Sequence, residues 1–144
     1  MNTNCSDKLK NHFESYLKKL DRKAYPLLGV RNKKIPSFWP AVSIGCEYRS
    51  CCICDSSGKS VSPQCHISLR KELEKLGPIG VKVSGCDSIN GSCAEDRSAD
   101  RVLEKWKMKH GEILTLDKLV FTPAVRARTR KVVKPCANCK KVFK

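Results

Sequence analysis

Cys93-Ala-Glu95 and Pro135-Cys-Ala-Asn-Cys139 are the two stretches that best predict the fold and the site of this chain. Zinc prefers thiolate and imidazole ligands in a tetrahedral shell, and a catalytic zinc keeps one position for water. Cys136 and Cys139 share one face of a helix if Pro135 begins it, and proline suits the first helical position because it has no N–H to lose there. Cys93, Cys136 and Cys139 are therefore predicted to bind one zinc ion.

Both stretches are expected at helix N-termini, where free N–H groups and the helix dipole lower the pKa of a thiol. Ser92 and Glu95 have the spacing of a capping box that would begin a helix at Cys93. Glu95 has two interpretations: it caps this helix, or it takes a proton from water at the metal and passes it to a departing amine. Cys136 and Cys139 have an alternative interpretation as half of a structural zinc knuckle or as a disulfide.

Three segments, Gly91–Ala99, Leu119–Thr129 and Pro135–Lys140, resemble the YwqJ-like deaminases, a branch of the cytidine deaminase superfamily that includes bacterial polymorphic-toxin domains. The resemblance extends over about residues 85–144. Such deaminases carry H-x-E or its cysteine variant, then P-C-x-x-C, and use the glutamate as a proton shuttle. The resemblance implies a zinc-dependent hydrolytic deaminase of a nucleobase. Cytosine is the more common target in this branch, with adenine and guanine as alternatives.

The resemblance also assigns roles to individual residues. Cys93, Cys136 and Cys139 match the zinc ligands, and Glu95 matches the catalytic acid/base. It implies a three-layer-like α/β deaminase fold, a mixed sheet with helices packed on it. Many deaminases continue with further strands and helices after the last ligand helix, whereas this sequence stops at Lys144, so the expected fold is truncated there.

One domain is expected over residues 1–144, with an N-terminal helix and connector in 1–40 and the zinc-dependent deaminase core in 41–144. Strands that alternate with helices predict a sheet covered by helices. Helices are expected over 6–20, from Ser62-Pro63, from Cys93 to Gly111 and from Pro135. Strands are expected over 42–55, 79–83 and 118–125, with a hairpin turn at 56–59 and an irregular connector over 25–40.

The charge of the chain is strongly positive, with 29 Lys+Arg against 14 Asp+Glu and a formal net charge of +15. Such an excess attracts polyanions, and that binding weakens with salt. Five basic residues precede the Pro-Cys pair and are predicted to hold phosphate near the reacting base, the alternative being a solvated hairpin: Arg126, Arg128, Arg130, Lys131 and Lys134. Nucleic acid, DNA or RNA, is the expected partner, and an immunity protein would be another if the chain is a toxin domain.

The chain has 10 cysteines. Zinc ligation needs reduced thiols, so the motif predicts action in a reducing compartment, cytoplasm or nucleus, after delivery to a target cell if the chain is a toxin. The N-terminus lacks the regions of a secretory signal, and no run approaches the ~18 apolar residues of a membrane span. A second group with His66 has two interpretations, another zinc site or, preferably, buried free thiols: Cys46, Cys51, Cys52, Cys54 and Cys65.

Three functions follow from these patterns. The first is deamination of a base within nucleic acid, for which the basic segment before Pro135 is the main argument. The second is deamination of free nucleosides or nucleotides, which has no need of that segment. The third is a non-catalytic, zinc-stabilised domain that binds nucleic acid.

Overall fold

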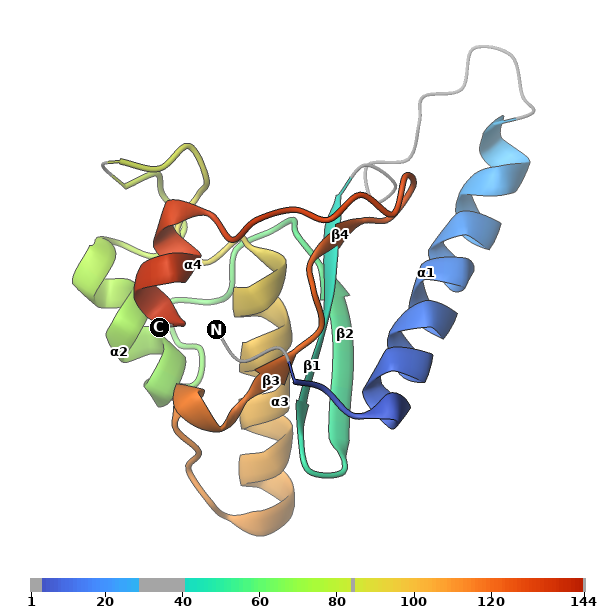
Figure 1. Cartoon of the computed structure of the whole chain (residues 1–144). Coiled ribbons are helices and arrows are strands. Elements are labelled where there is room, and N and C mark those ends of the chain that lie inside the picture. Colours follow the sequence, from blue (N-terminus) through green and yellow to red (C-terminus); the bar gives the residue numbers. More distant parts are fainter. Residues whose placement is uncertain (1–3, 29–40, 84, 144) are drawn as a thin grey trace.

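The computed structural model describes residues 4–28, 41–83 and 85–143, and it describes the side chains of the first helix as far as Ala24. Four helices pack on a four-stranded open sheet, so the predicted α/β class is confirmed (Figure 1). The elements in chain order are α1 (Asp7–Leu28), β1 (Val42–Tyr48), β2 (Cys51–Ser56), α2 (Ile67–Leu76), α3 (Ala94–His110), the 3₁₀ turn η1 (Leu116–Lys118), β3 (Val120–Phe121), β4 (Val125–Arg126) and α4 (Ala137–Val142).

The sheet is built around β1, which pairs with β2 along one edge and with β3 and β4 along the other. All of these pairings are antiparallel, so no parallel pair of the expected mixed sheet occurs among the described strands. The expected single strand over 42–55 is wrong. Arg49 adopts a left-handed backbone conformation with φ 52°, which turns the chain between Tyr48 and Cys51 and makes a hairpin of β1 and β2.

β3 and β4 are two parts of one strand that is interrupted by a bulge. Residues 122–124 lie opposite residues 44–45, so three residues face two. Pro123 has no N–H for the ladder. The Thr122 hydroxyl accepts a hydrogen bond from the Gly45 amide at 2.9 Å, and the Thr122 amide donates to the Gly45 carbonyl at 2.8 Å. The expected continuous strand over 118–125 is therefore wrong at Pro123.

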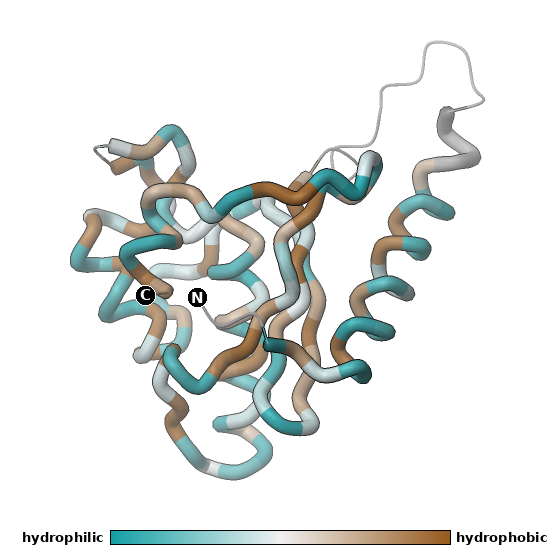
Figure 2. Tube along the Cα trace, viewed as in Figure 1, coloured by the Kyte–Doolittle hydropathy of each residue, from teal (hydrophilic) through white to brown (hydrophobic). Residues whose placement is uncertain are grey.

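Helices cover both faces of the sheet (Figure 1). On one face, Phe13, Leu17 and Leu20 of α1 pack with Cys54 and Ala127 in one core cluster. Figure 2 shows hydrophobic turns on the side of α1 that faces the sheet. On the other face, α3 forms the larger core with the sheet, and α2 and α4 lie beside it; the buried members include Ile44, Val102, Leu103, Trp106, Phe121 and Phe143.

Three further expectations about elements are wrong. α2 begins at Ile67 rather than at Ser62-Pro63, because the His66 imidazole accepts a hydrogen bond from the Ser68 amide and caps the helix. Residues 79–83 form only an isolated bridge, Lys82 to Ile89, instead of a strand. α1 runs to Leu28 instead of ending at Leu20, because residues 21–24 contain no helix breaker. Residues 29–40 of the expected connector lie outside the described residues.

Candidate metal centre

The first turn of α3 presents Cys93, which is the N-cap residue with an extended backbone. The predicted capping box is wrong: the Ser92 hydroxyl donates to the Ile89 carbonyl at 2.7 Å and does not cap the helix. Asp96, one residue after Glu95, lies 1% exposed in this turn. Burial raises the pKa of Asp96 to about 8, assisted by Glu95 and Cys136 and opposed by the Cys93 amide. The sequence reasoning missed Asp96, although an acidic residue three positions after an N-cap is a known helix-start signal.

The first turn of α4 presents the other two cysteines. Cys136 is the N-cap and the helix begins at Ala137, so Pro135 precedes the cap instead of occupying the first helical position as expected. This placement leaves the Cys136 sulfur beside the unpaired amides of the first turn, where anionic sulfur is favoured. Cys139 lies in the same turn, and its side chain is buried.

The three cysteine side chains meet although they come from two helices. All three Sγ atoms lie within 4.8 Å of one another, and the Sγ atoms of Cys93 and Cys136 are 3.2 Å apart. Sulfurs around a tetrahedral zinc, with Zn–S bonds of about 2.3 Å, lie about 3.8 Å apart. The cluster can therefore bind a metal ion such as zinc. Among the residues that the structure describes, no histidine, aspartate, glutamate or further cysteine joins these three as a fourth ligand.

The thiols differ in acidity. Contact with the side chains of Cys139 and Cys93 lowers the pKa of Cys136, and the amides of Cys139 and Asn138 lower it further, against the opposing effect of burial. The interaction with Cys136 raises the pKa of both Cys93 and Cys139, and burial adds to this effect. Cys136 is thus the most acidic of the three thiols, and Cys93 and Cys139 hold their protons more tightly. Metal binding must therefore release protons from the cluster.

Glu95 lies against the cluster and is only 4% exposed. Its Oε2 accepts a hydrogen bond from the Cys139 sulfhydryl at 2.8 Å. Burial raises the pKa of the Glu95 carboxyl, and the hydrogen bond from Cys139 opposes that effect. Glu95, the residue that the sequence predicts as the acid/base, therefore contacts one of the three clustered cysteines.

The predicted phosphate-binding residues lie in a hairpin that turns after β4. The Arg126 amide donates to the Lys131 carbonyl at 2.9 Å, and Val132 pairs back with Val125. Arg130 binds α1, with Glu14 at 2.7 Å and Asp21 at 3.5 Å. Arg130 therefore forms ion pairs with α1 on the side of the sheet opposite α3. The others lie along the exposed surface of this segment: Arg126, Arg128, Lys131 and Lys134.

The second cysteine group forms no further metal cluster among the described residues. Cys46, Cys51, Cys54 and Cys65 are buried, which fits the preferred interpretation of buried thiols, while Cys52 is partly buried. All ten cysteines fall in described segments and are free, consistent with a reducing compartment. No described helix is long and apolar enough to cross a membrane.

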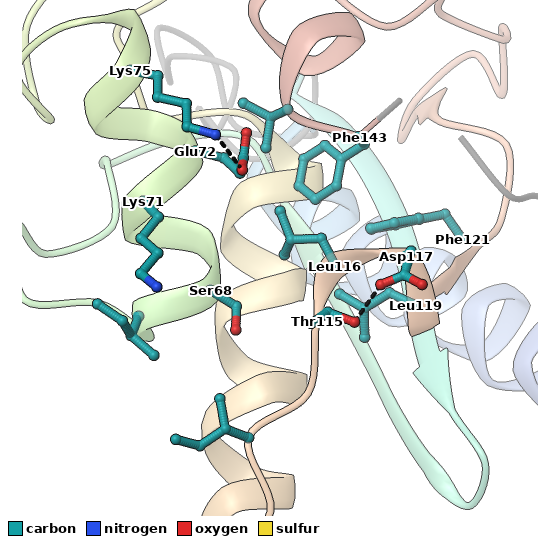
Figure 3. Close-up of a pocket in the computed structure, with 13 residues that line it drawn as sticks. Ser68, Lys71, Glu72, Lys75, Thr115, Leu116, Asp117, Leu119, Phe121 and Phe143 are labelled. Carbon is teal, nitrogen blue, oxygen red and sulfur yellow. Dashed lines mark hydrogen bonds and ion pairs between the residues drawn. The ribbon is translucent and has the colours of Figure 1, made fainter.

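A groove of about 740 Å³ opens between α2, η1, β3 and the end of α4 (Figure 3). Its apolar floor contains Leu116, Leu119, Phe121 and Phe143, and Lys71 lies on its rim. Neither the three cysteines nor Glu95 lines this groove. The sequence gives no local signal for it, because its residues come from four separate elements.

Comparison with known proteins adds no assignment: no protein-family model, curated protein or solved structure is significantly similar to this chain.

Proposed function

We propose that the protein is a zinc-dependent hydrolytic deaminase that converts a nucleobase, cytosine to uracil, within nucleic acid. One observation carries the proposal. Three cysteines gather with no fourth protein ligand among the described residues, and the Glu95 carboxylate contacts one of them. Structural zinc sites are closed by four protein ligands, whereas catalytic sites keep a position open. A buried acid/base beside an open position is the arrangement that hydrolytic chemistry needs.

Cys93, Cys136 and Cys139 would hold the ion. Zinc bound there would act as a Lewis acid and make a water nucleophilic near neutral pH. Glu95 is close enough to the ligand set to take one proton from that water and to return it to the exocyclic amine. The water oxygen would add to the ring carbon and the carbon–nitrogen bond would break, with one water proton leaving on ammonia and the other ending on ring nitrogen N3. Cytosine and water thus give uracil and ammonia.

The net charge of +15 supports a polymeric substrate over a free nucleoside. A cationic protein attracts the phosphate backbone, and a base in a duplex must leave the stack to reach a buried centre. Lys134 is exposed and lies two residues before Cys136, so its positive charge is near the candidate metal centre in sequence. Single-stranded or flipped-out cytosine is therefore the substrate that these features favour.

A non-catalytic, zinc-stabilised domain is the second candidate, and two observations favour it. Glu95 is only 4% exposed, so a base reaches it only if the surrounding loops move. The groove of about 740 Å³ lies away from the cysteines. In this alternative, the energy of zinc binding would serve folding alone.

Sequencing of exposed nucleic acid separates the candidates. Zinc-loaded wild type and Glu95→Gln are incubated with single-stranded DNA, duplex DNA, RNA and free cytidine. Base changes in a polymer with wild type, absent with a Glu95→Gln protein that keeps its zinc, support the proposal. Turnover of free cytidine alone supports the nucleoside enzyme. No change in any substrate at full zinc occupancy supports the structural domain.

A further inference from the structure

α1 is fixed firmly to the sheet, so its outward face is defined. The Ser6 amide and hydroxyl both donate to the Glu47 carboxylate, at 2.8 and 2.7 Å, and Ser6 Oγ accepts from the Leu9 amide. Leu9, at 0% exposed, and Leu17, at 2%, lie on the buried side. The apolar face of this amphipathic helix is thus buried against the sheet.

The acidic residues of α1 are all engaged in ion pairs. Asp7 lies 4.0 Å from Lys10, and Arg130 of the hairpin bridges Glu14 at 2.7 Å and Asp21 at 3.5 Å. These three carboxylates lie seven residues apart along one edge of the helix, the edge on which the hairpin docks. They therefore do little to neutralise the remaining basic residues of α1.

Four basic residues occupy the outward face of α1, and all are exposed: Lys18, Lys19, Arg22 and Lys23. They form two like-charged pairs at i, i+4, Lys18 with Arg22 and Lys19 with Lys23, and such pairs destabilise a helix. Within the described part of the chain, none of the four makes an ion pair with a carboxylate. These four side chains therefore form a row of positive charge without carboxylate partners, and the row does not stabilise the fold.

The basic row continues toward the cysteine cluster. Ala127 of the hairpin is buried against α1, and beyond it the chain passes the exposed Lys131 and Lys134 before it reaches Cys136. Figure 1 shows this segment running from beside α1 across the end of the sheet to α4. Exposed cations thus lie along a route between the two faces of the sheet.

We propose that the outward face of α1, with the hairpin that docks on it, binds the phosphate backbone of nucleic acid without sequence preference. The polymer would lie on the face of the sheet opposite α3. Its charge complements the row, and backbone binding of this kind needs no base contacts. A membrane surface fits less well, because a basic membrane helix needs an exposed apolar face and that of α1 is buried. The proposal does not rest on deaminase activity.

Fluorescence anisotropy with a labelled 20-nucleotide single strand, over a series of KCl concentrations, tests the proposal. The variant is Lys19→Ala/Arg22→Ala/Lys23→Ala. The control is Lys105→Ala/Lys107→Ala/Lys109→Ala, which removes the same charge from exposed positions of α3. Alanine favours helix, so α1 should stay folded, and circular dichroism verifies this. The α1 variant should lose about tenfold or more in affinity, and its salt slope should fall by about two units. The control should stay within about twofold of wild type.

Three results would overturn the proposal. Equal losses in variant and control would assign binding to net charge alone. Unchanged binding in the α1 variant would assign it elsewhere. Binding that depends on α1 with phosphatidylcholine–phosphatidylserine vesicles but is absent with the oligonucleotide would assign the surface to a membrane. Glu95→Gln should bind the oligonucleotide like wild type, so loss of deamination and loss of this surface are distinguishable.

Discussion

The Cys139 sulfhydryl lies 2.8 Å from Oε2 of Glu95 and joins the first turns of α4 and α3, 44 positions apart in sequence. A sulfur that binds metal gives up its proton and can no longer donate this hydrogen bond. If Cys139 binds a metal ion, it therefore loses this hydrogen bond, and the Glu95 carboxylate is freed from it. This contact is the geometric reason to treat Glu95 and the cysteines as one unit.

Replacing Cys136 should remove the metal. Cys136→Ser is expected to reduce bound zinc from one per chain to near zero, because two thiols and a hydroxyl make a much weaker site. The melting temperature should fall as well, since binding energy becomes folding energy. Metal analysis and thermal unfolding measure both effects. Cys86→Ser, outside the cluster, is the control and should keep its zinc. Full zinc content in Cys136→Ser would disprove the ligand assignment.

Local spacing correctly predicted that the two cysteine stretches lie at helix starts. This was possible because a cysteine pair at i, i+3 and a run of apolar residues at helical spacing are local features. The cap itself was mispredicted at Ser92, since its hydroxyl turns to the Ile89 carbonyl instead. The helix begins at Ala137, two residues after the expected start at Pro135, a difference within the ordinary uncertainty of a helix boundary.

Long-range contacts explain what the sequence did not predict. Arg130 is adjacent in sequence to other basic residues, but its role depends on Glu14 and Asp21, more than a hundred positions away. The bulge at Thr122 depends on the Gly45 amide of another strand. The turn at Arg49 uses a left-handed residue that is neither glycine nor asparagine, so no turn signal marks it.

Arg130 should contribute to the docking of α1 and not to nucleic-acid binding. Because the pairs with Glu14 and Asp21 are partly exposed, a double-mutant cycle of Arg130→Gln with Glu14→Gln should give a coupling of about 0.2–1 kcal/mol that shrinks with salt. Chemical denaturation measures it. The salt slope of oligonucleotide binding should stay near that of wild type. A fall of about one unit would place Arg130 on the phosphate backbone after all.

Thr122 should stabilise the bulge through its hydroxyl. Thr122 is 2% exposed, and Thr122→Val keeps its shape but leaves the Gly45 amide without its acceptor. An unsatisfied buried amide costs about 1–3 kcal/mol, so the free energy of unfolding should fall by that amount. Thr122→Ser keeps the acceptor and loses only a methyl group, so it should be the milder change. Denaturation curves in which serine is the more harmful substitution would contradict this role.

His66 should make stability depend on pH. Its Nδ1 accepts the Ser68 amide at 3.1 Å and caps α2, which only a neutral imidazole can do. Burial lowers the pKa of His66 below 6.5, helped by Lys107 and Arg70 and opposed by Glu104 and Asp100. The folded protein therefore binds this proton less readily than the unfolded chain, so stability is lost as pH falls below 6.5.

His66→Asn tests this pH dependence, because asparagine caps helices well and does not titrate in the range. The two proteins are unfolded in urea at pH 7.5, 6.5 and 5.5. Other groups contribute equally to both, so the difference between the two curves isolates His66. Wild type should lose more stability than His66→Asn between pH 6.5 and 5.5, and the loss should be small between 7.5 and 6.5. Parallel curves would mean that the folded protein accepts the proton as easily as the unfolded chain.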